Sequence, residues 1–329
     1  MWRYILKRLL AVVPIVLSIS IIGFISAETT SDPVTAYFGK VAGSRVSTGK
    51  EPTAAEREQA KIALGLDKPA ATRYLIWLRR IVKGDLGWTF TGKRVMDEIR
   101  SRLPVSLALG VSSLVIGTGG GVLLGVFMAR RQYSFFDYFM GTVNYLTISI
   151  PVVCLGMFCV MFFCVTLRWF PVYGLNSPVV VPLTGMAKVL DQAKHLALPS
   201  LILALPTMAT WARFQRAAYL EVMRSDFIRT ARSKGLSENR IAFRHALRNA
   251  LLPLAANSGG LIMGIFGGSY IIETLFTLPG IGLLTTQAFL SFDYNLMLST
   301  GLLNAVMGSL ALLISDIVCA VVDPRIRYE

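Results

Sequence analysis

Long apolar stretches that are nearly free of charge recur along this chain of 329 residues and constrain its fold more than any other feature. Each is about 18 residues or longer, enough for a helix to cross a hydrocarbon core roughly 30 Å thick. With 54% hydrophobic residues, 16% charged residues and a mean hydropathy of +0.58, the chain is not a soluble globule. We expect an all-α membrane protein with six spans, at Leu9–Ala27, Val105–Ala129, Ser149–Leu167, His195–Leu220, Leu254–Ile272 and Leu296–Val322.

The first apolar stretch follows the basic segment Met1–Arg8, so a secretory signal peptide is an alternative interpretation, with Ser26-Ala27 as its cleavage region. The apolar region of a signal peptide usually spans only about 7–15 residues. Leu9–Ala27 is longer than that, and more spans follow it. We therefore expect residues 1–27 to be a retained first span that starts in the cytoplasm.

The distribution of basic residues sets the expected orientation. Six spans that start inside also finish inside, which places four basic segments on one side of the membrane, as the positive-inside rule requires. These segments are Arg3–Arg8, Arg130-Arg131, Leu220–Pro253 and Arg325–Arg327. The formal net charge of +14 could suggest nucleic acid, but the cations cluster beside apolar runs, as they do in cytoplasmic loops. We expect both termini in the cytoplasm and no nucleic-acid partner.

Residues 28–103 form a polar region too long for a simple connection, so we expect it to carry structure of its own outside the cytoplasm. Thr53–Leu64 reads as a helix that stops at Gly65. Arg73–Lys83 reads as a second helix, with one apolar face and a basic face turned away from it. That pattern suits a helix that lies on the membrane surface or packs over the mouth of the bundle. The apolar positions are Tyr74, Trp77, Leu78 and Ile81, and the basic ones are Arg79, Arg80 and Lys83.

Small residues and breaks mark the spans themselves. Glycines recur at every fourth position in the second and fifth spans, a pattern that lets another helix approach closely; they are Gly117, Gly121 and Gly125, and Gly260, Gly264 and Gly268. Pro151 predicts a kink between a short interfacial segment and the third span. We expect Arg168–Lys194 to form an outside loop. Glu273–Tyr294 is semi-apolar and broken at Pro279 and Gly280, so we expect a re-entrant or surface hairpin there.

The segment Leu220–Pro253 is polar and strongly basic, and it lies between two apolar runs. It reads as two short helices with a hinge. Ser225 or Asp226 can cap the first, Phe227–Lys234, because short oxygen acceptors satisfy the free N–H groups of a first turn. Gly235 stands where helices commonly end in a left-handed residue. Ser237 can cap the second helix, whose Arg240, Arg244 and Arg248 share one face and whose end bends at Pro253.

That segment suits a partner outside the membrane, although its second-helix arginines could instead serve anionic lipid head groups. The chain shows no chemistry of its own to drive transport. No nucleotide-binding loop, nucleophile elbow or HExxH motif is present, and the four cysteines and two histidines have no ligand spacing, so we expect no metal site and no catalytic residue. A stand-alone secondary transporter would need coupling-ion residues within its spans, and the spans of this chain offer almost none. An intramembrane enzyme would need paired catalytic groups at matching depth, and none align here. The residues that remain as gating or pathway candidates are the polar Glu273, Asn257 and Asn304 and the helix-breaking Pro279 and Gly280, with Asp316 near the inner end of the last span.

Asp226–Leu236 (DFIRTARSKGL), followed by Arg244–Pro253 (RHALRNALLP), resembles the cytoplasmic loop of permease subunits of ABC importers in the dipeptide/oligopeptide/nickel family. The coupling motif of these importers has the form EAA, three residues, then Gly. Here only Ala231 and Gly235 match it, while Arg229 and Thr230 resemble the peptide-importer variant. Further matching motifs are LGLDKP at Leu64–Pro69, Arg73-Tyr74, GDLG at Gly84–Gly87, ETLFTLPGIG at Glu273–Gly282, Asp293-Tyr294 and DPRIRY at Asp323–Tyr328.

The resemblance implies a type I ABC importer permease in the inner membrane of a prokaryote, with a core domain of five spans at residues 104–329 and a coupling loop at residues 221–253. It implies a coupling helix that docks on an ATPase subunit, formed by Asp226, Phe227, Ile228, Arg229, Thr230, Ala231, Arg232, Ser233, Lys234, Gly235 and Leu236. ATP and magnesium would bind to two ATPase partners and not to this chain.

A second, related permease chain would complete the pathway, and an extracytoplasmic binding protein would deliver the cargo. Peptides are the expected cargo, with nickel chelates or opines as the alternative within the family.

Overall fold

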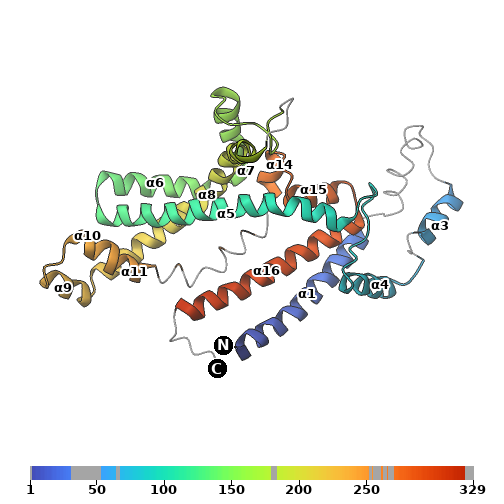
Figure 1. Ribbon diagram of the computed structural model, residues 1–329, viewed down its shortest axis with the longest axis horizontal. Coiled ribbons are helices and arrows are strands. Elements are labelled where there is room, and N and C mark those ends of the chain that lie inside the picture. The colour runs from blue at the N-terminus through green and yellow to red at the C-terminus, as the bar shows by residue number, and fades with distance from the viewer. Residues whose placement is uncertain are drawn as a thin grey trace. The chain divides into compact units, whose positions relative to one another are not determined.

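The computed structural model describes residues 2–30, 53–63, 67–178, 184–251 and 270–322, with the single positions 254, 261 and 265. Over these residues the chain is helical, and the β-pairing in this part is one isolated bridge between Trp88 and Arg94. The expected all-α class is therefore confirmed for the described residues. The helices, shown in chain order in Figure 1, divide into two compact units, Met1–Val105 with Pro279–Leu310 and Ser106–Leu278 with Ala311–Glu329.

The first unit is built on the N-terminal helix and the first part of the last helix, which run side by side in Figure 1. Phe24 is buried between them, and its ring meets that of Tyr294 edge to face at a centroid distance of 6.0 Å. A second apolar cluster joins the start of the next long helix, through Val95 and Ile99, to the segment around Leu284. The helices of this unit are α1 (Trp2–Thr30), α3 (Ala54–Ala63), α4 (Ala70–Val82), the start of α5 (Val95–Arg130), α15 (Ile281–Leu290) and the part of α16 (Tyr294–Val322) up to Leu310.

Helices α3 and α4 confirm the two helices predicted in the region after the first span, although the expected stop at Gly65 lies outside the described residues. In α4 the predicted apolar face is half-buried and the predicted basic residues are exposed. The ring of Tyr74 packs on Phe24 of α1 at 5.5 Å, and the ring of Trp77 at 6.3 Å. The 3.6-residue period alone was enough to identify this face, because side chains three and four positions apart lie on one side of a helix.

The second unit contains the rest of α5 and the helices that follow it. In Figure 1, α6 and α8 run beside the part of α5 that belongs to this unit. The other elements of this unit are α6 (Phe135–Ser149), α7 (Val152–Cys159), the π-helix η2 (Val160–Thr166), α8 (Gly185–Met223), α9 (Asp226–Ser233), α10 (Glu238–Arg240), the π-helix η3 (Ile241–Ala246), α11 (Leu247–Ala250) and α14 (Tyr270–Leu275).

The predicted glycine stripe of the second span is the surface on which α5 and α8 meet. A Cβ atom added at Gly121 would come within 2.7 Å of Trp211 Cβ, and one at Gly125 within 2.5 Å of the carbonyl oxygen of Ala212. A Cβ atom added at Gly117 would come within 2.9 Å of Thr207 Cβ. The absence of side chains at these positions therefore lets the two backbones approach each other, as the spacing predicted. The corresponding stripe at Gly260, Gly264 and Gly268 lies outside the described residues.

The kink predicted at Pro151 is confirmed. Helix α6 ends at Ser149, α7 begins at Val152, and the two helix axes are bent by 105°. Proline disfavours a helical conformation of the residue before it, and Ile150 accordingly adopts an extended conformation with ψ 124°.

Three described helices are long and apolar enough to cross a membrane, namely Val95–Arg130, Gly185–Met223 and Tyr294–Ser315, and the bent pair Phe135–Thr166 would make a fourth. The apolar part of α1, Leu10–Ser26, is shorter, and the fifth expected span, Leu254–Ile272, lies largely outside the described residues. The count of six spans thus stays a prediction.

One predicted boundary is wrong. The expected outside loop Arg168–Lys194 ends at Thr184, because α8 begins at Gly185 and runs through the polar residues ahead of its apolar part. Hydropathy marks the part of a helix that lies in the membrane, whereas the helix itself continues as far as its residues favour it.

Candidate functional site

The basic segment folds as predicted into two helical parts with a hinge. The first helix, α9, covers Asp226–Ser233, one residue earlier than expected, and follows Ser225 in an extended conformation. The Ser225 hydroxyl donates to the Val222 carbonyl at 2.5 Å and makes no capping bond to α9, so its predicted capping role is wrong. Gly235 ends the turn with φ +72°, the left-handed conformation predicted for it.

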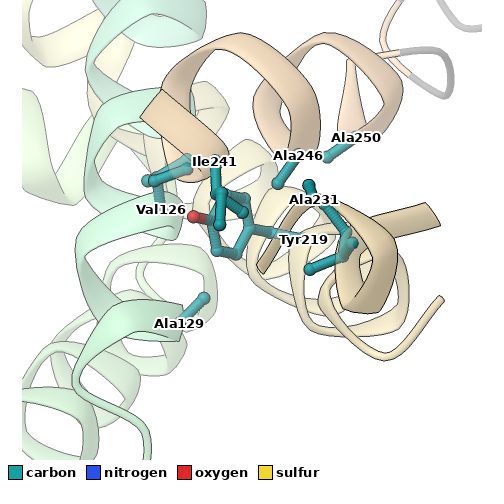
Figure 2. Packing of buried hydrophobic residues seen from close by; sticks show 9 residues of the cluster. Val126, Ala129, Tyr219, Ala231, Ile241, Ala246 and Ala250 are labelled. Atoms are coloured by element: carbon teal, nitrogen blue, oxygen red, sulfur yellow. The ribbon is translucent and has the colours of Figure 1, made fainter. Parts of the chain in front are cut away.

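The inward face of α9 is held by an apolar cluster, which we call the platform. In it Ile228 is fully buried and Ala231 is 7% exposed. Both belong to one cluster with residues from the ends of two long helices and from the second half of the basic segment. Figure 2 shows Ala231 in this cluster. The remaining buried members are Val126 and Ala129 of α5, Tyr219 of α8, Ile241, Ala242 and Ala246 of η3, and Ala250 of α11. Leu236 is half-buried against the same cluster.

The outward face of α9 is free of such packing. Phe227 is 45% exposed, and Arg229, Thr230, Ser233 and Lys234 are also exposed. The ion pair between Arg229 and Asp226 is 3.4 Å long with both side chains largely in solvent, so it contributes little to stability. The helix therefore presents an aromatic ring among cations and hydroxyls to whatever lies beyond it.

The hinge after α9 is closed by a pair that spans it. Arg232 donates from Nε to Glu238 Oε1 at 2.8 Å and from Nη2 to Oε2 at 3.3 Å. The hydrogen bond from this guanidinium holds the pKa of the Glu238 carboxyl below its usual value. Arg130, at the end of α5, donates to Asn239 Oδ1 at 3.0 Å and lies over the Phe243 ring at 5.7 Å. The hinge is thus tied both to itself and to a long helix.

The second half of the segment begins after Ser237, whose side chain makes no capping hydrogen bond, so its predicted capping role is wrong. The π-helix η3 at Ile241–Ala246 then interrupts this half. Arg240, Arg244 and Arg248 are all exposed. The wider turn of η3 brings Ile241, Ala242 and Ala246 onto the platform. The predicted bend at Pro253 lies outside the described residues.

Sequence reasoning missed a charged pair close to this segment. Arg216 of α8 donates from Nε and Nη2 to the two carboxylate oxygens of Asp137 on α6, at 2.7 and 2.6 Å. Asp137 is 4% exposed and also accepts a hydrogen bond from the backbone N–H of Tyr133 at 3.0 Å. The bidentate geometry fixes α6 against α8. The sequence offered two signals for this pair. Asp137 stands three positions after Ser134 at a helix start, and Arg216 lies in a largely apolar helix.

The gating and pathway candidates do not gather into one site within either unit. Glu273 of α14 is fully buried in the second unit, where its Oε1 accepts a hydrogen bond of 2.8 Å from Ser106. Pro279 and Gly280 lie in the first unit, in the break between α14 and α15, which confirms the predicted break. Asn304 lies on α16, also in the first unit. Asn257 and the side chain of Asp316 lie outside the described residues.

No three His, Cys, Asp or Glu side chains of the described residues gather in a way that could hold a metal ion. The arrangement of the site is instead mechanical. A short helix with an exposed outer face rests on a core that it shares with two long apolar helices, so a force on the helix reaches both of them.

Comparison with known proteins places these features in context. Residues 121–328 match the family described as binding-protein-dependent transport system inner membrane component, and residues 1–110 match the N-terminal part described for such membrane components. The chain is 36% identical to the oligopeptide transport system permease protein AppB of Bacillus subtilis, over the whole length of both. It is 33% identical to the di/tripeptide transport system permease protein DppB of Pseudomonas aeruginosa, again over both full lengths.

Among solved structures, the inward-facing MetNI methionine ABC transporter matches with a TM-score of 0.56 at 17% identity, covering 69% of this chain and 97% of that one. At this identity the likeness concerns the fold, which is that of an ABC importer permease.

Proposed function

The chain belongs to the family of binding-protein-dependent transport system inner membrane components, and we propose that it forms one half of the pathway by which an ATP-driven importer carries peptides. It is a transport subunit of a multi-pass membrane protein complex. The hydrolysis of ATP takes place on partner subunits, which bind the nucleotide and magnesium. This chain forms part of the translocation pathway and makes the contact with an ATPase subunit through which conformational changes are transmitted.

The observation that supports this role best is the two-sided construction of α9. Its inner face, Ile228 and Ala231, is buried in the platform, while Phe227 on the outer face is 45% exposed. A helix held rigidly on one side and open on the other is suited to be gripped by another chain. Exposed aromatic residues surrounded by polar groups are typical anchors of protein interfaces.

The mechanism follows from what the platform connects. ATP binding draws two ATPase subunits together and moves the helix docked on each of them. Since α9 shares a core with the ends of α5 and α8, displacement of α9 carries these helices with it. The bidentate Arg216–Asp137 pair passes the displacement on from α8 to α6. The bundle then rocks as rigid bodies between inward-open and outward-open states.

In this proposal the chain contacts four kinds of partner in the complete transporter. Two ATPase subunits hold the docked helices, a second permease of related sequence completes the pathway, a binding protein delivers the cargo, and lipid surrounds the spans. Six spans with both termini in the cytoplasm place α9 on the ATPase side. The arrangement of basic segments supports this orientation.

Peptides are the proposed cargo because the full-length relatives are named as oligopeptide and di/tripeptide permeases. Within such systems the binding protein selects much of what is carried. Uptake by proteoliposomes that contain the complete complex, measured with labelled peptides and with nickel chelates or opines as competitors, tests the assignment. Competition by a chelate or an opine and not by a peptide would overturn the peptide proposal.

The docking role is tested by truncating one exposed ring and comparing it with a matched one. Phe227 on α9 and Phe243 on η3 are 45% and 44% exposed. In the reconstituted complex we expect Phe227→Ala to lower peptide uptake about tenfold or more while ATP hydrolysis continues, since truncating an anchor at an interface costs about 2 kcal/mol or more. Phe243→Ala removes the ring beneath Arg130 but no side chain of α9, so it should lower uptake much less. Equal losses in the two variants would refute docking through α9.

Two further changes act on the same helix. Gly235→Pro cannot adopt the left-handed φ of +72° and should uncouple hydrolysis from uptake while the chain still inserts into the membrane. Charge reversal at Arg229 and Arg232 should do the same. Of the two, Arg229→Glu is the cleaner test, because Arg232 also closes the hinge to Glu238. Normal uptake in these variants would count against the docking role.

A further inference from the structure

A cavity of about 260 Å³ lies in the first unit, between α1 and α16 and against α4 and α15. Its walls are mostly apolar and include Ile19 and Gly23 of α1, Trp77 of α4, Phe289 of α15, and Met297 and Gly301 of α16. The hydroxyl of Ser20, which also lines it, is already engaged with the Leu17 carbonyl and the Tyr74 hydroxyl, each at 2.8 Å. The space is therefore suited to hydrocarbon and not to water, since apolar cavities stay dry.

The surroundings of the cavity supply hydrocarbon. Side chains along α1 are widely exposed although they are apolar, among them Val13 at 54%, Ile22 at 64% and Ile25 at 56%. In a membrane protein such a face lies against acyl chains. A cavity that opens between two apolar helices at this surface is narrow, below the usual size of a pocket for a whole small molecule. One acyl chain fits its width and its chemistry.

The helix over the cavity offers hydrogen-bond donors without acceptors. The Nε1–H of Trp77 is buried and has no partner among the described residues. The Nε–H of Arg73, one turn earlier on α4, is also without one, but its Nη2 donates to Glu28 at 2.6 Å, so that guanidinium is already paired. Buried donors of this kind are normally paired. The ester and phosphate oxygens of a phospholipid are acceptors only, and tryptophan is enriched where such groups meet the hydrocarbon layer.

The outer side of α4 adds positive charge. Arg79 and Lys83 are exposed and make no ion pair with any residue that the structure describes, whereas Arg80 is bonded to Asp85 at 2.9 Å. Basic residues at the membrane surface attract anionic head groups. We propose that the cavity holds one acyl chain of an anionic phospholipid, whose ester oxygens lie beside Trp77, while the exposed Arg79 and Lys83 raise the concentration of anionic lipid around α4.

This site is distinct from the coupling segment and does not depend on what the transporter carries. Bound there, the lipid fills the gap between α1 and α16 and holds α4 against the membrane surface. The interaction is thus specific for a head group as well as for an apolar chain.

The test uses Trp77 as its own reporter. In the full chain with the other four tryptophans, Trp2, Trp88, Trp169 and Trp211, changed to Phe, the remaining fluorescence comes from Trp77. The chain is placed in vesicles of phosphatidylcholine that contain a minor fraction of phosphatidylglycerol or phosphatidylcholine with brominated acyl chains. We expect the brominated phosphatidylglycerol to quench at least about twofold more strongly, because the basic residues enrich it at the site.

Gly301→Leu tests the cavity, because a Cβ atom at Gly301 meets nothing within 4 Å and the side chain can enter the space. This change should lower the quenching by brominated phosphatidylglycerol to the level of phosphatidylcholine. Gly23→Leu, on the opposite wall and equally unobstructed, should have the same effect and guards against misfolding of one variant. Gly119→Leu, at an unobstructed glycine of α5 that does not line the cavity, is the matched control and should leave the quenching unchanged.

The head-group contact is tested separately. Arg79→Gln with Lys83→Gln should abolish the preference for phosphatidylglycerol and retain quenching by both lipids. Native mass spectrometry of the purified full chain should show one retained phosphatidylglycerol, which Gly301→Leu releases. Equal quenching by the two head groups in the parent chain, or full quenching in both cavity-filling variants, would overturn the proposal.

Discussion

The attachment of α9 to the platform makes Ile228→Ala the most informative change. Ile228 is fully buried, and in this cluster it is the largest side chain that α9 itself contributes. Removing its buried carbons loses transfer free energy and leaves a cavity, which for Ile→Ala costs about 2–4 kcal/mol. Because α9 makes few other buried contacts, we expect this cost to appear as local opening of α9 and not as unfolding of the chain.

The free-energy cost of Ile228→Ala sets the expected increase in the population with α9 locally open. A loss of about 2–4 kcal/mol corresponds to about a 30- to 900-fold larger open population, since 1.36 kcal/mol is a factor of ten. Hydrogen–deuterium exchange of the full-length protein in detergent should show this acceleration for amides of Asp226–Leu236, with little change in the amides of α5. Peptide uptake by the complete complex should fall while ATP hydrolysis persists.

Phe227→Ala is the matched control, because it truncates the adjacent residue on the exposed face. It should leave exchange in the isolated chain unchanged and still lower uptake, since it removes a contact to the partner and none to the platform. If Ile228→Ala accelerated exchange less than about threefold, well below the range that burial predicts, the platform would not be what holds α9. The transmission of force through it would then be refuted.

Three further predictions concern the packing behind α9. Gly125→Ala places a carbon 2.5 Å from a backbone oxygen of α8 and should destabilise the protein by about 1–3 kcal/mol in thermal unfolding, whereas Gly119→Ala, with open space, should be neutral. Asp137→Asn removes the charge that neutralises Arg216 and should lower the stability of the protein by about 3 kcal/mol. Adding Arg216→Gln should recover much of that loss. If the effects of the two substitutions were additive, the pair would not be coupled. The hinge should lose protection from exchange as the pH falls below the usual pKa of Glu238 and through its lowered value, because protonation removes the hydrogen bond that lowers it; a Glu238→Gln variant that kept this pH dependence would contradict the assignment.

Periodicity and single special residues explain why much of the fold could be read from the chain. The glycines at every fourth position of α5 identified its contact face without its partner, because close approach of two helices needs small residues wherever that partner lies. Pro151 and Gly235 act through their own backbone restrictions, so the bend of 105° and the left-handed turn followed from residue type. The apolar face of α4 followed from its spacing in the same way.

The parts that were missed depend on contacts between distant residues. Asp137 and Arg216 are 79 positions apart, and neither residue alone indicates the other. The buried state of Ile228 and Ala231 divides the predicted coupling residues into an attached face and a free one. The sequence motif identified the eleven positions 226–236 as a group. It did not indicate which of them are buried and which are exposed, because the motif matches the whole stretch. The early start of α8 was missed because apolarity was used to delimit a helix that extends beyond its apolar part.

The order of residues by itself determined the helical class, the breaks, the small-residue contact face and the position of the short helix α9. These features arise from local backbone preferences and from the dimensions of a bilayer, which act on each stretch of chain independently. Only the tertiary structure decided which face of α9 is held, which charge pairs with Arg216, and that α1, α4, α15 and α16 enclose a mostly apolar cavity. Those properties come from packing between residues far apart in the sequence, where shape and burial set the outcome and composition does not.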